Sequence, residues 1–242
     1  MQRRIHWLDD RDETLFPPPE QALTQPNGLV AIGGTLSERR LLAAYRRGIF
    51  PWYEEDQPVL WWSPDPRGVL FPASLRVPRS LRKRIRNSGF HVTMDTAFED
   101  VITACAAPRG REAGTWITKD MHDAYCHLHD RGLAHSVEIR HHFRLVGGLY
   151  GVSLGRAFFG ESMFSREPDA SKIALVYLTR QLQRWGFHFL DCQILSPHLQ
   201  GMGAEERPRS RFLADLDAAL QAADLAGPWQ FDADFSPLEP SA

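Results

Sequence analysis

The amino-acid sequence predicts an α/β protein in two parts: a small N-terminal domain of residues 1–66 and a larger domain of residues 67–242 with a mixed β-sheet. Three observations support this fold class. The 242 residues are 43% hydrophobic and 24% charged, which is typical of a folded globular chain. A stretch rich in proline and aromatic residues, 50–67, marks the boundary between the parts. Beyond it, helix-like and strand-like patterns alternate, as they do in α/β sheets.

The first part is expected to contain one clear helix, which begins after Ser37. The Ser37 hydroxyl can cap it, Leu41, Leu42 and Tyr45 recur at helical spacing, and Gly48 follows its basic end. The proline run at 17–19 predicts an irregular N-terminal arm. The stretch 50–67 contains too many prolines for a regular helix.

The second part is expected to contain helices and strands in mixed order. Thr96 and Glu99 have the spacing of a capping box, which predicts a helix after the strand at 91–94. A later helix, which lies between the strands at 156–164 and 187–195, is expected to start at Asp169 or Ser171 and to end at Gly186. The first predicted elements are a basic helix at 78–88, a strand at 91–94 followed by the helix near Thr96, a helix at 119–131 and a strand at 134–140. They are followed by a hairpin of strands 145–152 and 156–164 that turns at 153–155, the helix that ends at 186, a strand at 187–195 and a helix at 209–222.

The strand near 156–164, the helix after it and the strand at 187–195 form a βαβ crossover. Such crossovers are nearly always right-handed and place the two strands parallel in one sheet. Because residues two apart on a strand share a face, Glu161 and Met163 are expected to point to one side of the first strand. Asp191 and Gln193 are expected to share a side of the second. If both sets face the same way, the four side chains line one cleft.

Asp191 and Gln193 lie in an apolar run, where an ionised group needs a partner. A glutamine amide can donate to a carboxylate while its carbonyl oxygen accepts from an incoming N–H. We therefore interpret Gln193 as a group that orients an attacking amine, and Asp191 as the group that fixes the glutamine amide. The alternative is a buried polar pair that only satisfies the ends of the strands.

The sequence lacks the motifs that activate an acyl group. It has no GxxxxGK[ST] loop for ATP and no GxSxG nucleophile elbow. The segment 144–149 approaches the phosphate loop of acetyltransferases, but it falls inside a strand and so lacks a helix N-terminus for phosphate. The acyl donor is therefore expected to arrive already activated on a carrier other than CoA, and no cofactor is expected.

Two features favour an RNA carrier. Trp52, Trp61, Trp62 and Trp116 lie in loop-like contexts, where an indole can stack on a base or pack the domain boundary. A run of basic residues without any acid extends from 76 to 86, in a chain whose net charge is −2. It is either a solvated helix face or a surface that binds phosphates. The candidate RNA contacts in it are Arg76, Arg79, Arg82, Lys83, Arg84 and Arg86.

Other classes of protein receive little support. No apolar run is long enough to span a membrane, and the N-terminal residues do not read as a secretory signal. The histidines show no metal-binding spacing, so no metal site is expected. Cys192 is expected on the face opposite Asp191, as a core residue rather than a nucleophile. Three scattered cysteines suggest reduced thiols and a cytoplasmic location.

Many segments, in order, resemble the leucyl/phenylalanyl-tRNA–protein transferase family. They span about residues 26–212, most of the chain, and it is their number and order that makes the resemblance strong. They are Pro26-Asn-Gly-Leu, Gly33-Gly34, Tyr45-Arg-Arg-Gly-Ile-Phe-Pro-Trp52, Trp61-Trp-Ser-Pro-Asp-Pro-Arg67, Gly114-Thr-Trp-Ile-Thr118, Ala134-His-Ser-Val-Glu138, Val146-Gly-Gly-Leu-Tyr-Gly151, Phe159-Gly-Glu-Ser-Met-Phe-Ser165 and Leu190-Asp-Cys-Gln193.

The resemblance implies a second domain like the GCN5-related acetyltransferases, without CoA. It implies a monomeric enzyme that moves Leu or Phe from aminoacyl-tRNA to the α-amino group of proteins with an N-terminal Arg or Lys, which tags them for degradation by the N-end rule. The implied roles are orientation of the amine by Asp191 and Gln193, a hold on the aminoacyl end by Glu161, contacts to the terminal adenosine by Trp52 and Trp116, and an apolar pocket that includes Leu149 and Met163.

The chain departs from the family pattern at a few positions, where it carries Leu149, Ser196, Gly201 and Met202. These leave open the relative preference for Leu, Phe or Met. Two rival functions remain at this point. One is a CoA-dependent N-acetyltransferase of similar fold, and the other is an RNA-binding module without catalytic activity.

Overall fold

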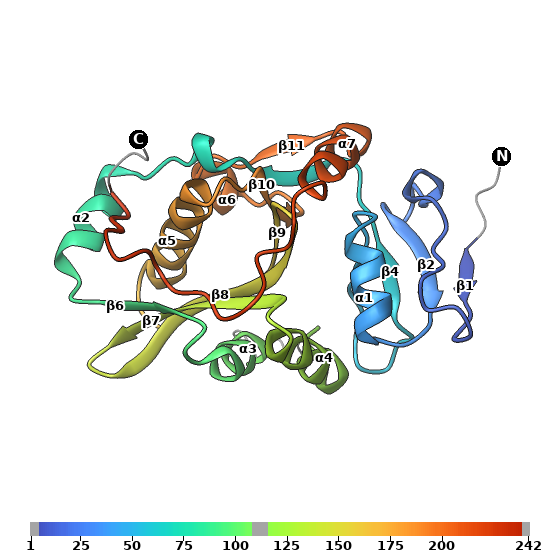
Figure 1. Ribbon diagram of the computed structural model, residues 1–242, viewed down its shortest axis with the longest axis horizontal. Helices are drawn as coiled ribbons and strands as arrows, with labels where there is room; N and C mark the ends of the chain where they lie inside the picture. The colour runs from blue at the N-terminus through green and yellow to red at the C-terminus, as the bar shows by residue number, and fades with distance from the viewer. Residues whose placement is uncertain (1–4, 108–115, 239–242) are drawn as a thin grey trace.

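The computed structural model describes residues 5–107 and 116–238, and it contains two β-sheets (Figure 1). The smaller sheet belongs to the N-terminal part and has the strand order β1-β2-β4-β3. Its strands β1 and β2 are parallel, whereas β4 runs antiparallel to both β2 and β3. The strands are β1 (His6–Leu8), β2 (Leu29–Gly33), β3 (Phe50–Pro51) and β4 (Leu60–Trp62).

The larger sheet has seven strands in the order β11-β5-β10-β9-β8-β7-β6. Only the pair β9 and β10 is parallel, and the other neighbours are antiparallel. The sheet is therefore mixed, as the sequence predicts. Its strands are β5 (Arg67–Leu70), β6 (His91–Met94), β7 (Ala134–His141), β8 (Arg144–Leu154), β9 (Ala157–Ser165), β10 (Phe189–Gln193) and β11 (Glu205–Arg207).

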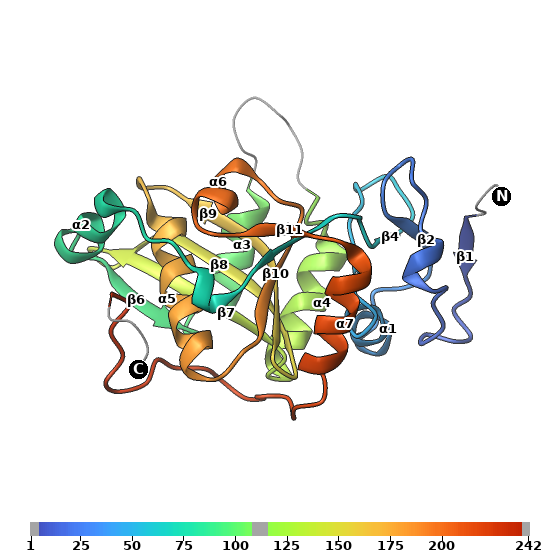
Figure 2. The same ribbon diagram turned by 90° about the horizontal axis from the view of Figure 1, so that it is seen from above.

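Helices cover both faces of the larger sheet (Figures 1 and 2). On one face α3 packs against β7, β8 and β9 and α4 packs against β7, and on the other face α5 crosses β7, β8 and β9. The basic helix α2 packs against α5, at the end of the molecule opposite the N-terminal sheet. The helices are α1 (Glu38–Tyr45), α2 (Arg79–Asn87), α3 (Phe98–Ala106), α4 (Lys119–Asp130), α5 (Ala170–Arg184), α6 (Pro197–Gly201) and α7 (Arg209–Ala219), with short 3-10 helices at Pro19–Gln21 and Pro72–Ser74.

The two parts of the chain share one of the two hydrophobic cores. Tyr45 and Phe50 of the N-terminal part are buried in the same cluster as Tyr125, Phe159 and Phe212 of the larger part. The second cluster lies on the opposite face of the sheet, beneath α5 and α2. Side chains of the N-terminal part can therefore reach the centre of the larger sheet.

Most expected elements are confirmed. Ser37 caps α1 by accepting from the Arg40 backbone N–H, and α2, β6, α4, β7 and α5 lie within a few residues of the predicted ranges. The β8–β9 turn falls at residues 155–156, slightly later than predicted. The last helix ends at Ala219 rather than at 222, and β10 is shorter than predicted at both ends.

Three expectations were wrong or incomplete. The N-terminal arm is irregular only in part: residues 9–18 form no helix or strand, but β1 joins a sheet. The strands of that sheet are too short to show an alternating pattern. Strand β5 lies in the Pro-rich boundary and escaped prediction. Thr96 does not cap α3, because its hydroxyl donates to the buried carboxylate of Glu138 at 2.8 Å, and the N-cap is Ala97 without a side-chain bond.

Candidate functional site

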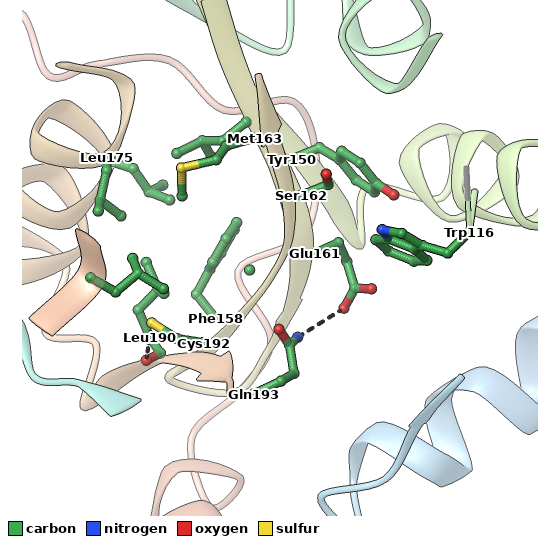
Figure 3. Close-up of a pocket in the computed structure, with 14 residues that line it drawn as sticks. Trp116, Tyr150, Phe158, Glu161, Ser162, Met163, Leu175, Leu190, Cys192 and Gln193 are labelled. Atoms are coloured by element: carbon green, nitrogen blue, oxygen red, sulfur yellow. Dashed lines mark hydrogen bonds between the residues drawn. The ribbon is translucent and has the colours of Figure 1, made fainter. Parts of the chain in front are cut away.

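The site lies where β9 and β10 separate. The two strands are paired only as far as Phe159 and Asp191, whereas on its other edge β10 stays paired with β5 as far as Gln193. Glu161 and Gln193 each lie two residues beyond this last pair. Their side chains meet across the split, and the Gln193 amide Nε2 donates to Glu161 Oε1 at 3.4 Å (Figure 3).

A bulge in β9 changes which side chains share a face. Tyr150 is opposite Ser162 and Gly151 is opposite Gly160, so Glu161 is an extra residue without a partner on β8. A side chain at Gly151 could not fit here, because a Cβ atom would lie 2.1 Å from the Phe159 carbonyl oxygen. The extra residue inverts the alternation, as β-bulges do.

The bulge corrects the expectation that Glu161 and Met163 share a face. Glu161 points toward the side of Tyr150 and Trp116, whereas Met163 points to the other side with Phe158 and Leu190 (Figure 3). Both still line one pocket, because the gap between the strands opens to both faces. The predicted cleft is therefore confirmed only in part: Glu161, Met163 and Gln193 line it from both faces of the sheet, but Asp191 does not.

The pocket has a volume of about 270 Å³ and two chemically distinct sides. The polar side carries Glu161, Gln193, Ser162, Tyr150 and Trp116. The other side is apolar and includes the predicted Leu149, which is buried, and Met163, which is half-buried; the two are paired in register on β8 and β9. The remaining lining residues are Phe158, Gly160, Leu175, Leu178, Leu190, Cys192 and Leu199.

Asp191 does not line this pocket. It is fully buried and forms a two-pronged ion pair with Arg67, whose Nε and Nη2 donate to the carboxylate at 2.8 and 2.7 Å. Arg67 is equally buried, donates to the Gly48 carbonyl oxygen at 3.1 Å and lies over the Phe50 and Phe212 rings. This pair ties β10 to β5, to the N-terminal part and to α7.

The predicted contact between Asp191 and the Gln193 amide takes another form. Asp191 Oδ1 accepts from the Gln193 backbone N–H at 2.9 Å, and this leaves the side-chain amide to reach Glu161. Gln193 has φ = +55°, a conformation that costs about 1 kcal/mol for a residue other than glycine. Gly68 allows the turn, since a Cβ there would lie 2.7 Å from the Leu195 nitrogen. Asp191 thus fixes the backbone from which the glutamine projects.

Besides the Gln193 amide of β10, side chains from two helices enclose Glu161. The hydroxyl of Tyr45, on α1, lies 2.7 Å from Oε1, and the hydroxyl of Tyr125, on α4, lies 2.9 Å from Oε2. Burial raises the pKa of Glu161 to about 7, although the hydrogen bonds from both tyrosines lower it and Arg67 partly offsets the effect of Asp191. Burial, with Glu161 close by, also raises the pKa of each tyrosine. The carboxyl group can therefore change its protonation state near neutral pH.

This raised pKa predicts how stability depends on pH. In the unfolded chain the carboxyl ionises near 4.5 and in the folded chain near 7. The contribution of Glu161 to the free energy of unfolding should be fully present below about pH 4.5 and should fall by roughly 3 kcal/mol as the pH rises to above 7. Urea unfolding of the wild type and of Glu161→Gln over this range measures the difference. Parallel pH profiles for the two proteins would contradict the prediction.

The predicted tryptophan contacts occupy different places. Trp116 lines the pocket, and Trp52 is 44% exposed but is not among the lining residues. Trp61 is fully buried, with its Nε1 donating to the Gly33 carbonyl oxygen at 2.8 Å, so it packs the N-terminal part and cannot stack on a base. Trp62 donates to the Trp52 carbonyl oxygen at 2.7 Å. Gly114 and Thr115, which precede Trp116, lie outside the described residues.

The predicted RNA contacts lie away from this pocket. Leu81 is the buried residue that anchors α2, while Arg79, Arg82, Lys83 and Arg86 are exposed. Arg84 is half-buried, 3.6 Å from Glu167 and stacked on Phe90, so it is less available to a partner. Arg76 lies apart from the helix and borders a separate polar hollow near Gln200 and Glu205.

Other candidates remain without a catalytic environment. Cys192 is buried, and burial raises the pKa of its thiol, which disfavours a nucleophilic thiolate. In the part of the chain that the structure describes, no group of three or more His, Cys, Asp or Glu residues is placed to hold a metal. In the same residues, no helix has the length and apolar character needed to cross a bilayer.

Sequence reasoning missed three residues of the site. Tyr45, Tyr125 and Arg67 come from separate elements, and no short-range pattern links them to Glu161 or Asp191. Tyr45 is the first residue of one family-like segment and Arg67 is the last residue of another. Their place in these segments was the sequence signal that could have identified them. A role for them became visible only when the fold brought them to β9 and β10.

Two family models match this chain, and relatives with the same family name are highly similar to it. The family described as "Leucyl/phenylalanyl-tRNA protein transferase" matches residues 69–217, and the family of its N-terminal domain matches residues 34–65. A protein of that name from Aromatoleum aromaticum is 62% identical over 225 residues, which cover 93% of this chain and 94% of the relative. Another, from Thiobacillus denitrificans, is 59% identical over 90% of this chain and 95% of its own length.

Solved structures show a more distant similarity. A GCN5-related N-acetyltransferase from Kribbella flavida aligns with a TM-score of 0.39 and 12% identity, covering 69% of this chain and 60% of that one. L-PGS from Bacillus licheniformis aligns with a TM-score of 0.39 and 11% identity, covering 69% and 53%.

Proposed function

The chain belongs to the leucyl/phenylalanyl-tRNA protein transferase family, and we propose that it moves Leu or Phe from aminoacyl-tRNA to the α-amino group of proteins with an N-terminal Arg or Lys. It is an aminoacyltransferase, and neither rival function is favoured. The feature of the site that carries the finer proposal is the two-sided pocket, in which the Gln193 amide meets Glu161 beside an apolar wall. The acceptor residues follow the family resemblance, and the product is proposed to be tagged for degradation by the N-end rule.

The apolar wall suits the transferred side chain. Leu149, Met163, Leu175 and Leu190 present branched or flexible groups, which pack equally well against an isobutyl or a benzyl group. Burying such a side chain gains about 1.5–3 kcal/mol. A smaller side chain loses only part of that gain, so selection against it is graded.

The polar side suits the reaction. The Gln193 carbonyl oxygen can accept from the incoming α-amine, while its amide NH2 is directed to Glu161. This arrangement holds the amine with its lone pair free to attack, which is catalysis by orientation. We assign Glu161 to the aminoacyl end, Trp116 to the terminal adenosine inside the pocket, and the exposed Trp52 to the same nucleotide from outside it.

Transfer of labelled leucine from charged tRNA to peptides tests this function. A peptide with an N-terminal Arg or Lys should accept leucine, and the same peptide with an N-terminal Ala should not. A peptide whose α-amine is acetylated is the matched control. Equal transfer to the Arg and Ala peptides would refute the acceptor specificity, and no transfer to any peptide would refute the function.

The exposed face of α2 is proposed to bind phosphates of the tRNA. Replacing Lys83 and Arg86 by Ala should raise KM for charged tRNA and reduce the slope of log KM against log salt by about 2, since each lost phosphate contact removes about 1. The control is Arg131→Ala with Arg211→Ala, two exposed arginines far from α2 in the chain. A salt slope unchanged by the α2 variant would show that this face is only solvated.

The remaining proposals concern organisation. We place the boundary between the two parts at residues 66 and 67, between β4 and β5. We also propose that the protein is a monomer, and sedimentation at the assay concentration tests this. None of the three cysteines, all of them within the described residues, forms a disulfide, which is typical of the reducing cytoplasm, where we expect the reaction to occur.

A further inference from the structure

Tyr45, Tyr125 and Glu161 form a closed ring of oxygen contacts. The two tyrosine hydroxyls lie 2.5 Å apart, Tyr45 Oη is 2.7 Å from Glu161 Oε1, and Tyr125 Oη is 2.9 Å from Oε2. The three residues come from α1, α4 and β9, so the ring exists only because the N-terminal part packs against the larger sheet. Every contact in the ring is within hydrogen-bond distance.

The number of protons in the ring decides its charge. Each tyrosine hydroxyl supplies one proton, and an ionised carboxylate supplies none. Two protons cannot fill three oxygen–oxygen contacts, so with an ionised Glu161 one contact would bring lone pairs together without a hydrogen between them. A protonated Glu161 supplies the third proton: the acid donates to Tyr125, Tyr125 donates to Tyr45, and Tyr45 donates back to the other carboxyl oxygen. The geometry therefore matches a neutral acid.

The surroundings leave this proton movable. Asp191 raises the pKa of Glu161 and Arg67 lowers it, and these two residues form an ion pair with each other. Tyr150 packs edge-on against Tyr125, and the other polar neighbours, Gln193 and Trp116, do not titrate. The acid form and the ionised form of Glu161 are thus close in free energy near pH 7. A group with that property at a pocket wall is suited to exchange protons with a substrate.

We propose that Glu161 is the proton acceptor of the reaction and that Tyr125 and Tyr45 hold the proton with it until it passes to the leaving oxygen. This inference rests on the proposed function. The amine nitrogen forms a bond to the ester carbon, and the bond from that carbon to the ribose oxygen breaks. The nitrogen loses one proton to ionised Glu161, and the ring returns one proton to the ribose oxygen, so no net proton is gained or lost. Glu161 is then the catalytic residue, and the tyrosines are positioning residues.

The direct test is the titration of Glu161 itself, which needs no activity. Infrared difference spectra of the wild type against Glu161→Gln should show a carboxylic C=O band that disappears as the pH rises through about 7. In Tyr125→Phe the band should persist to a pH about one unit higher, because the carboxylate loses a donor. Tyr177→Phe, which removes a hydroxyl outside the ring, should leave the midpoint unchanged. A Glu161 band that disappears near pH 4.5 would overturn the ring.

The kinetic test is single-turnover transfer of leucine to an Arg-initiated peptide between pH 5.5 and 9. Glu161→Gln should slow transfer by about 100-fold or more at every pH, the range of general acid–base catalysis. Tyr125→Phe and Tyr45→Phe should be slowed about 10-fold at pH 7 and should approach the wild-type rate at pH 9. Tyrosine variants slowed equally at every pH would overturn the proton role. A normal titration in a chain that transfers nothing to any peptide would instead refute the proposed function and the catalytic part of this inference with it.

Discussion

Asp191→Ala is expected to destabilise the protein by about 3–5 kcal/mol and to lower kcat/KM for leucine transfer by at least about 100-fold. Its carboxylate is the partner of a fully buried arginine, and removing it leaves the Arg67 guanidinium charged without a counter-ion. It also releases the Gln193 backbone N–H, and a displacement of about 1 Å at a reacting group can cost about 100-fold in rate. Urea unfolding and single-turnover kinetics measure the two effects.

A double variant separates the two roles of Asp191. Replacing a buried ion pair by apolar residues of similar size is often neutral or stabilising, so Arg67→Met with Asp191→Leu should recover most of the lost stability. It cannot restore the acceptor for the Gln193 N–H, so transfer should remain slow. Binding of tRNA should survive, because the proposed tRNA-binding helix α2 packs against α5, whereas the pair lies on β5 and β10. Recovery of transfer together with stability would show that Asp191 is only structural.

Gln193→Ala is expected to lower kcat for transfer by about 100- to 1000-fold with little change in stability. The variant removes the carbonyl oxygen that we assign to the attacking amine, and losing one aimed polar group in an active site typically has an effect of this size. The hydrogen bond that it also removes, to Glu161, is 3.4 Å long and weak. Steady-state kinetics at saturating charged tRNA measure the effect.

The backbone conformation of Gln193 supplies the matched comparison. Glycine adopts φ = +55° without strain, so Gln193→Gly should be about 1 kcal/mol more stable than Gln193→Ala and equally slow. The strained backbone at position 193 would then be kept because the site needs the glutamine side chain. A Gly variant that transfers leucine at the wild-type rate would be incompatible with any role for the amide.

Much of the fold is predictable because it depends on local chemistry. The cap at Ser37, the arginine-rich helix α2 and the apolar stripe of α5 are each encoded within a single element. The short N-terminal strands and β5 were not predictable in this way. They are two to five residues long, lie among prolines and gain their stability from pairing with distant strands.

The site shows the same division. Glu161, Gln193, Leu149 and Met163 could be nominated from polar groups in apolar strands and from the family-like segments, and all four line the pocket. The face of the sheet to which each of these side chains points could not be predicted, because one extra residue in β9 inverts the alternation on which the prediction relied. Asp191 was nominated correctly as a partner of Gln193 but was placed wrongly, since its side chain turns to Arg67.

By itself the sequence determined the mixed α/β architecture, the crossover that pairs β9 with β10, and the family to which the chain belongs, because local patterns and ordered motifs record these. Only the tertiary structure decided which groups meet. Tyr45 and Tyr125 enclose Glu161 from elements 116 and 36 residues away, and Arg67 neutralises Asp191 from 124 residues away. The physical reason is that charge and protonation depend on what surrounds a group once water has been excluded, and the packing of the whole chain sets those surroundings.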